Sequence, residues 1–192
     1  MAKYYYAPYN DTEMQKYAEA LVDAKNGRMN THRLVTTLEN VGHFDRLYVI
    51  LHGGDGILGW KEHRIDEVEA EFMGTKTLIK EKNHKVHEIT PEVLCTDLID
   101  AGLRNKRIDL RLFACNSGKS METPVKKHEP VAQQLLAWLR QRGRNRISVS
   151  GYTELLDVTA SQIRRNKQKR VIIDKEDNKS IYPRAKNYRR KF

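Results

Sequence analysis

Residues 47–54 read LYVILHGG, and this short stretch decides the fold class. Five apolar residues in a row, ended by a histidine and two glycines, are typical of a strand that is buried on both of its faces. Strands of this kind belong to parallel sheets whose faces are covered by helices. The stretch therefore predicts an α/β protein.

A second strand of the same sheet is predicted at residues 108–114. This stretch reads IDLRLFA, with apolar residues at alternate positions, and it is followed by Cys115 and a turn. Between the two strands, Thr90 and Pro91 form a typical helix start and Gly102 a typical helix stop. A strand, a crossover helix and a second strand form one unit, so we expect the two strands to be neighbours.

The rest of the chain continues this alternation. Apolar residues at helical spacing predict an amphipathic helix that begins behind Asn10, with Glu13 completing a cap signature, and ends near Gly27. The further elements predicted are a helix over residues 129–143 and strands over residues 147–151, 3–6 and 171–174. This order predicts a mostly parallel central sheet with helices on both faces. Two polar stretches interrupt it: residues 60–88 are a long insertion with some β character at Thr77, Leu78 and Ile79, and residues 119–128 are a short loop. Long loops in a compact domain are usually functional or mobile.

The composition fits one domain with a basic C-terminal segment. The 192 residues hold 35 Lys and Arg against 25 Asp and Glu, a net charge of +10. Residues 163–192 hold 12 of the basic and 3 of the acidic residues, a balance of +9, so residues 1–162 are nearly neutral. We expect an α/β domain over residues 1–162 and a basic segment over 163–192, separate or packed on the same domain, that attracts polyanions.

Cysteine content and hydropathy exclude two classes of protein. Two cysteines, Cys95 and Cys115, cannot build a disulfide-rich secreted scaffold, and reduced thiols are typical of a cytosolic compartment. No apolar run approaches the ~20 residues of a transmembrane segment, and residues 1–6 do not begin a secretory signal. We expect a protein of the cytoplasm, or one delivered into a host cytosol; the sequence does not indicate its oligomeric state.

Two residues that can perform chemistry follow the two principal strands. His52 ends the first strand and Cys115 ends the second. Ligands and catalytic groups of α/β sheets gather at the carboxyl ends of the strands. A thiolate is an effective nucleophile, and a nearby histidine can activate it and protonate the leaving group. The sequence thus predicts a Cys-His pair at one edge of the sheet.

These stretches, LYVILHGG and LRLFACNSG, resemble the caspase-like cysteine peptidases, a family that includes caspases, gingipains, clostripain, separase and the self-processing domains of large bacterial toxins. The resemblance spans residues 47–152 and implies a caspase-like three-layer α/β/α fold. It also implies a cysteine endopeptidase that acts on a protein or peptide substrate and requires no cofactor. Cys115 would be the nucleophile, His52 the acid and base, and the backbone N–H groups of Gly53 and Cys115 the oxyanion hole.

The resemblance has consequences for specificity and processing. Gln does not precede Ala114-Cys115 as it does in caspases, and their basic pocket residues are not recognisable, so a preference for aspartate is not expected. Glu154 and Asp157 follow the strand beside which this family builds its specificity pocket, and would favour Lys or Arg before the scissile bond. Self-cleavage, as in the toxin domains and bacterial effectors, is expected within residues 60–88 or 119–128.

The basic segment has three interpretations. The toxin domains are activated by inositol hexakisphosphate through a basic surface, and by resemblance the same activator would bind here. The alternative function is a non-enzymatic α/β module that binds nucleic acid or another polyanion, with His52 and Cys115 incidental. A solvated chain end is the third interpretation. The residues concerned are Arg164, Arg165, Lys167, Lys169, Arg170, Arg184, Lys186, Arg189, Arg190 and Lys191, of which the first five are the principal candidates for a polyanion site.

Each candidate also has a structural interpretation. Cysteine is among the most buried residue types, and Cys95, beside the apolar stripe of its helix, is expected only to pack. Asp55 follows the glycines and either orients His52 or shapes the turn. No metal site is predicted, because neither CxxC nor HExxH occurs and His43, His63, His84 and His87 lie in polar stretches where histidines are usually solvated.

Overall fold

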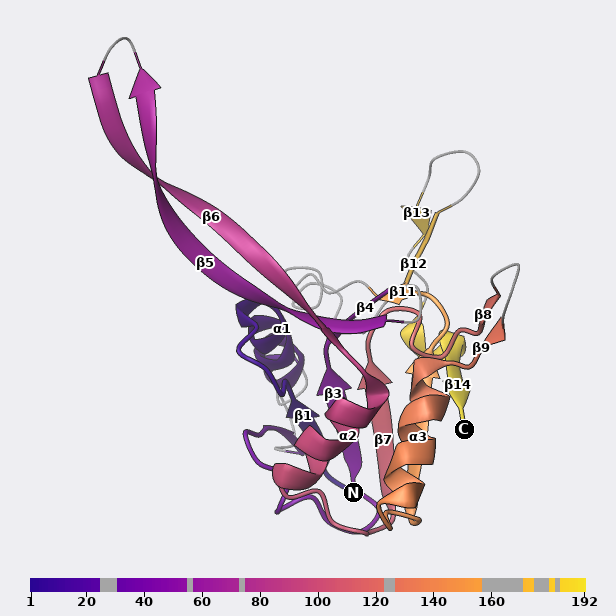
Figure 1. The fold of residues 1–192 in the computed structure, drawn as a ribbon. Helices are drawn as coiled ribbons and strands as arrows, with labels where there is room; N and C mark the ends of the chain where they lie inside the picture. The colour runs from indigo at the N-terminus through magenta and orange to yellow at the C-terminus, as the bar shows by residue number, and fades with distance from the viewer. Residues whose placement is uncertain are drawn as a thin grey trace.

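The computed structural model describes the chain except for residues 25–30, 55–56, 73–74, 123–126, 157–170, 175–179 and 182–183. Its centre is a six-stranded sheet in the order β14-β10-β7-β3-β1-β2 (Figure 1). The strands are β1 Lys3–Tyr6, β2 His32–Leu34, β3 Arg46–Ile50, β7 Ile108–Phe113, β10 Ile147–Tyr152 and β14 Arg189–Lys191. All neighbouring pairs are parallel except β10 and β14. This confirms the predicted α/β class and mostly parallel sheet.

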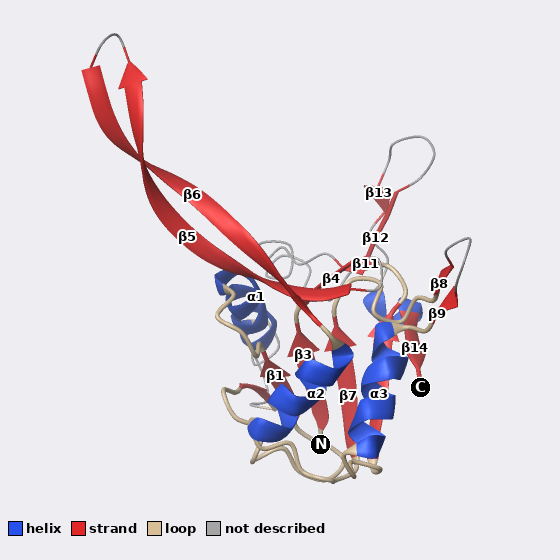
Figure 2. Ribbon diagram, viewed as in Figure 1, coloured by secondary structure: helices blue, strands red, loops and turns tan. Residues whose placement is uncertain are grey.

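Helices pack on both faces of this sheet (Figure 2). They are α1 Thr12–Asp23, α2 Pro91–Asp100 and α3 Val131–Gln141. Leu47 and Val49 of β3 belong to the buried cluster that includes α2 and α3, whereas Tyr48 and Ile50 belong to the cluster that includes α1. Alternate residues of a strand point to opposite faces, so β3 is buried on both sides, as its unbroken apolar run predicts.

The first helix differs from its prediction at both ends. Its cap is Asp11 and not Asn10, because the Asp11 carboxylate accepts the backbone N–H groups of Glu13 and Met14 at 3.0 and 3.1 Å. The helix ends at Asp23, with Ala24 as its last half-helical residue, before the predicted stop at Gly27. The second helix begins as predicted, with Thr90 accepting the N–H of Val93.

The stretch over residues 60–88, predicted as a polar insertion with some β character, is a long hairpin. β4 His52–Gly54, β5 Ile57–Phe72 and β6 Thr75–Ile89 form an antiparallel sheet. The pairing of β5 with β6 is continuous from Leu58–Ile89 to Phe72–Thr75, and the hairpin extends well away from the central sheet (Figure 1). The full hairpin was not predicted, because most of its residues are charged or polar and the β character at residues 77–79 is short.

The remaining strands are short. The second expected loop holds the pair β8 Met121–Glu122 and β9 Lys127–His128, and a third sheet consists of β11 Leu155–Leu156, β12 Val171–Asp174 and β13 Ser180–Ile181. The chain end joins the main sheet, because β14 pairs with β10 and the preceding 3-10 helix η1, Ala185–Tyr188, buries Ala185 beside Tyr152. Over the described ranges, none of the helices has the length and apolarity to cross a membrane.

Candidate functional site

The register of β3 and β7 brings His52 and Cys115 to the same level of the sheet. Ile50 is paired with Phe113, and His52 and Cys115 each follow two residues later. Ile50 and Phe113 lie in the cluster under α1, and Cys115 packs against this cluster. Residues two apart in a strand share a face, and the contacts of His52 with α1 place it on this face as well. The two residues therefore share one edge and one face.

The turn that carries Cys115 is fixed against the end of β10. The hydroxyl of Ser117 donates to the carbonyl of Ala114 at 2.8 Å and accepts the N–H of Tyr152 at 3.1 Å. The N–H of Gly118 donates to the carbonyl of Tyr152 at 2.7 Å. Buried hydrogen bonds of this kind hold a backbone in one conformation. The position of Cys115 is therefore determined by two strands, β7 and β10.

The thiol of Cys115 is half-buried beside Leu156. Sγ accepts the backbone N–H of Leu156 at 3.2 Å, and Leu156 itself is buried. Burial raises the pKa of the Cys115 thiol, and the hydrogen bonds from the backbone N–H groups of Leu156 and Cys115 offset only part of this effect. The thiol is therefore protonated near neutral pH and needs a base to become a nucleophile.

His52 faces two carboxylates at the start of α1, that of the cap residue Asp11 and that of Glu13 in the first turn. Its Nε2 lies 3.2 Å from Asp11 Oδ2 and 3.7 Å from Glu13 Oε2. The Asp11 contact is an ion-pair distance without hydrogen-bond alignment, since the buried Nε2 has no aligned hydrogen-bond partner within the part of the chain that is described. Lys61 also joins this group, with its backbone N–H 2.7 Å from Asp11 Oδ2 and its Nζ 3.4 Å from Glu13.

Asp11 is held as an anion. Burial by itself raises the pKa of this carboxyl, but the nearby His52 and the backbone N–H groups of Lys61 and Met14 outweigh burial and lower the pKa to about 2. Its side chain is only 2% exposed. A buried carboxylate against an imidazole fixes the orientation of the ring. Sequence reasoning missed Asp11 because it placed the helix cap on Asn10; Asp55, its candidate for this role, lies outside the described residues.

Gly53 is close to the backbone of Cys115. A Cβ atom on Gly53 would lie 2.6 Å from the carbonyl oxygen of Cys115 and 3.0 Å from its nitrogen, whereas a Cβ on Gly54 would meet nothing within 4 Å. These short distances are incompatible with any side chain unless the backbone shifts. The two residues predicted to form an oxyanion hole are therefore adjacent in space.

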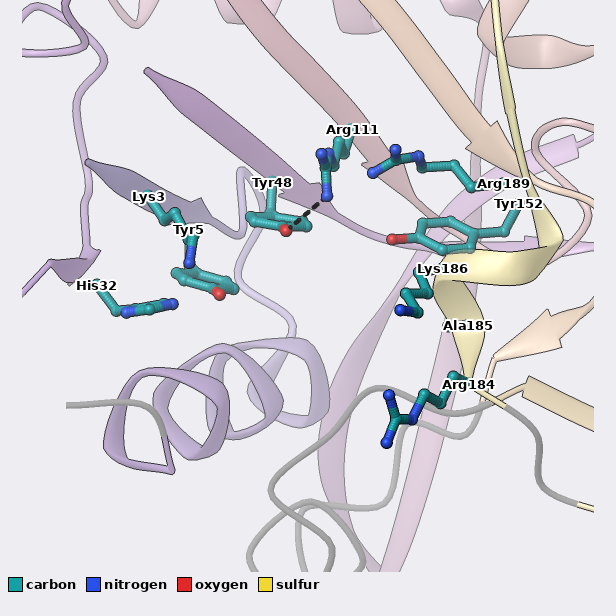
Figure 3. A pocket seen from close by; sticks show the side chains of 10 residues that line it. All are labelled: Lys3, Tyr5, His32, Tyr48, Arg111, Tyr152, Arg184, Ala185, Lys186 and Arg189. Atoms are coloured by element: carbon teal, nitrogen blue, oxygen red, sulfur yellow. Dashed lines mark hydrogen bonds between the residues drawn. The ribbon is translucent and has the colours of Figure 1, made fainter. Parts of the chain in front are cut away.

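A basic pocket of about 330 Å³ lies on the α1 face of the sheet (Figure 3). Its cationic lining, together with one histidine, consists of Lys3, His32, Arg111, Arg184, Lys186 and Arg189. Three tyrosines, Tyr5, Tyr48 and Tyr152, line it as well. Among its described lining residues there is no carboxylate. This composition suits an anionic ligand with several phosphate or carboxylate groups.

The floor of this basic pocket is rigid. Arg111 is 9% exposed. Its guanidinium donates from Nη1 to the Tyr48 hydroxyl at 3.0 Å (Figure 3) and from Nη2 to Asp109 at 2.7 Å. Burial, followed by the charges of Arg46 and Arg111, lowers the pKa of Lys3. Neighbouring positive charges with this effect indicate a positive potential in the pocket.

The other predicted site residues are only partly placed by the structure. The carbonyl of Glu154 accepts the N–H of Asn116, so its backbone lies beside the Cys115 turn. Residues outside the described part of the chain are Asp157, Arg164, Arg165, Lys167, Lys169 and Arg170. Of the basic residues that the sequence analysis names in the C-terminal segment, Arg184, Lys186 and Arg189 line the basic pocket. In the described ranges, no group of three or more His, Cys, Asp or Glu residues is arranged to hold a metal ion.

Comparison with known proteins gives no relative for this chain. It has no significant match to any family model, to any curated protein or to any solved structure. Function is therefore inferred from the residues and their geometry.

Proposed function

We propose that the protein is a cysteine peptidase with Cys115 as nucleophile and His52 as proton acceptor and donor. The observation that carries this proposal is the register of β3 and β7, which ends both strands at one edge and directs both side chains to one face. A thiol and an imidazole in this arrangement suit nucleophilic catalysis. Helices on both faces of the sheet support a caspase-like three-layer arrangement as part of the proposal.

The proposed reaction uses the groups at this edge. Because Nε2 of His52 faces Asp11, Nδ1 is the nitrogen left to take the proton from Cys115. The thiolate attacks the peptide carbonyl carbon, and the N–H groups of Gly53 and Cys115 hold the oxyanion, each worth about 3 kcal/mol. The C–N bond then breaks as His52 protonates the amine. Water hydrolyses the thioester and restores the thiol.

The described conformation corresponds to a resting form in this proposal. Leu156 lies beside the thiol, and its backbone N–H donates a hydrogen bond to Sγ of Cys115. Leu156 belongs to the same buried cluster as Tyr152 and Ala185, both of which line the basic pocket. An anion that draws Arg184, Lys186 and Arg189 together would act on this cluster. We therefore propose a polyanion such as inositol hexakisphosphate as activator.

The second candidate function is polyanion binding without catalysis. The basic pocket favours it, because six of its lining residues are basic side chains or histidine and because Arg111 is buried on its floor. In this case an inositol phosphate or a nucleic acid would bind, and Cys115 would only pack. The two candidates differ in whether Cys115 is activated by His52.

Site-resolved alkylation by iodoacetamide, read by mass spectrometry between pH 5 and 9, separates these candidates. Cys95 is the internal reference, because it is buried in α2 and 1% exposed. For a peptidase, we expect Cys115 to react much faster than Cys95 below pH 7, to lose this advantage in His52→Ala, and to react faster with inositol hexakisphosphate. A Cys115→Ala variant should lose all peptide cleavage. An inert Cys115 with and without the polyanion would contradict the peptidase and favour the binding module.

A further inference from the structure

The base of the β5–β6 hairpin touches the residue that faces His52. Leu58 and Ile89, the first pair of the hairpin, are buried in the body of the protein. Lys61 comes three residues after Leu58 in β5, and the far part of the hairpin lies well away from the body (Figures 1 and 2). The hairpin root, defined as Trp60, Lys61 and His87, thus lies between the body and the projecting strands.

The backbone of Lys61 is bonded to Asp11 and not to the partner strand. Antiparallel residue pairs alternate between those that exchange hydrogen bonds and those whose N–H groups point away from each other. Lys61 is paired with Val86, and the Lys61 N–H donates to Asp11 Oδ2 at 2.7 Å, so this pair is of the second kind. The same oxygen lies 3.2 Å from His52 Nε2. One carboxylate oxygen therefore links the hairpin to the imidazole.

An aromatic stack holds both strands of the hairpin root to the segment before α1. Trp60 stacks on Tyr9, with ring centroids 5.7 Å apart, and on His87, with centroids 4.3 Å apart. The ring of His87 is held in turn by Glu62, at 2.9 Å. Tyr9 precedes the helix cap, and its carbonyl accepts the N–H of Asp11 at 2.8 Å. The stack thus fixes Lys61 and Asp11 relative to each other.

We propose that the hairpin root is a positioning element for His52, acting through Asp11. The Lys61 N–H keeps Asp11 Oδ2 directed at the imidazole, and the Tyr9–Trp60–His87 stack keeps Lys61 in place. The contribution of the hairpin root to catalysis rests on the proposed peptidase function, whereas its positioning of His52 does not. Small displacements of a reacting group cost large factors in rate, so the hairpin root would control reactivity without touching substrate.

The test is Lys61→Pro, which removes the N–H that donates to Asp11 and leaves the pairing of β5 with β6 intact, since that N–H is not part of the ladder. The substitution also removes the contact of Lys61 Nζ with Glu13, and Lys61→Ala, which removes this contact and keeps the N–H, separates the two effects. Val86→Pro is the matched control, because Val86 is the opposite residue of the same pair and its N–H points away from Asp11. Both are made in the full chain. The readouts are the NMR chemical shifts of the His52 ring and the alkylation rate of Cys115.

We expect Lys61→Pro to move the His52 resonances and to slow Cys115 alkylation about 10- to 100-fold, and Val86→Pro to do neither. Trp60→Ala removes the stack but keeps the Lys61 N–H. It should shift the same resonances, because Lys61 is no longer held in place, and it serves if Lys61→Pro does not fold. Unchanged His52 resonances in the folded variants would overturn the positioning role. If the His52 resonances shift but the alkylation rate of Cys115 does not depend on His52, the positioning role is supported and the peptidase function is rejected.

Discussion

Asp11 Oδ2 lies 3.2 Å from His52 Nε2, and the same carboxylate is the cap of α1. The two roles use different oxygens. Oδ1 accepts the N–H groups of Glu13 and Met14, whereas Oδ2 faces His52 and accepts the N–H of Lys61. Helix capping and imidazole orientation can therefore be separated by substitution.

Asp11→Asn should impair the site more than the fold. Asparagine caps helices about as well as aspartate, so Oδ1 would still serve α1. The new amide would present N–H groups to the Lys61 N–H and to His52, which removes the charge that orients the ring. We expect the rate constant of Cys115 alkylation and the kcat/KM of peptide cleavage each to fall about 10- to 100-fold. Asp23→Asn, the same change at the exposed end of α1, should have no such effect; equal losses would contradict the role of Asp11.

The stability of the protein should depend on Asp11 in acid. Its pKa of about 2 lies below the ordinary value of 3.8, so the folded state favours the carboxylate more than the unfolded state does. This difference in pKa contributes on the order of 2 kcal/mol to the free energy of unfolding above pH 3.8, and the contribution is lost as the pH falls through 2. Urea unfolding of the natural chain and of Asp11→Asn should give a stability difference at pH 6 that shrinks by pH 2.5. A stability difference that does not change with pH would refute the lowered pKa of Asp11.

The central fold could be predicted because its strands are buried on both faces. The apolar runs that became β3 and β7, and the cap at Thr90, are local features of the chain, and the structure has them within one residue of prediction. The hairpin of β5 and β6 could not be predicted in this way. Its strands are mostly charged or polar. Apolar residues alternate with glutamates only over residues 67–72, and the continuous pairing depends on backbone hydrogen bonds that composition does not reveal.

The candidate site was predictable only where chemistry and strand ends coincide. His52 and Cys115 are reactive residue types at two such ends, so their sequence neighbours were sufficient to select them. Asp11 comes from a helix start that only the folded chain brings to His52. The basic pocket likewise joins Lys3 of β1 with Arg189 of β14 across the sheet. Arg189 was a candidate from the sequence, but only the folded chain brings it to the same pocket as Lys3.

Gly53→Ala should disturb the Cys115 backbone. The added methyl group would lie 2.6 Å from the Cys115 carbonyl oxygen, and backbone cannot rotate away as a side chain can. Removing one well-placed oxyanion donor typically costs 10²- to 10³-fold in kcat, and we expect a loss of about 100-fold in peptide cleavage. Gly54→Ala is the control, since open space surrounds that position. Thermal unfolding checks that both variants fold, and comparable cleavage by the two would argue against this oxyanion hole.

Arg189 and Arg190 offer a matched test of the basic pocket. Arg189 lines the pocket, whereas the Arg190 guanidinium lies 5.1 Å from the ring of Phe192 and is not part of the lining. They are adjacent in β14, so their side chains point to opposite faces of the sheet. Arg189→Gln and Arg190→Gln each remove one positive charge, and any effect of net charge alone would be the same in both.

Titration with inositol hexakisphosphate, followed by calorimetry, should distinguish the two variants. A hydrogen bond to a charged group contributes about 1.5–3 kcal/mol, so Arg189→Gln should weaken binding about 10- to 100-fold at fixed salt. Arg190→Gln should leave the affinity within about twofold, because screened long-range charge contributes little beyond a Debye length. Equal weakening in both variants would mean that the anion is held by the general positive charge of the C-terminal segment, and the basic pocket would lose its role as a specific site.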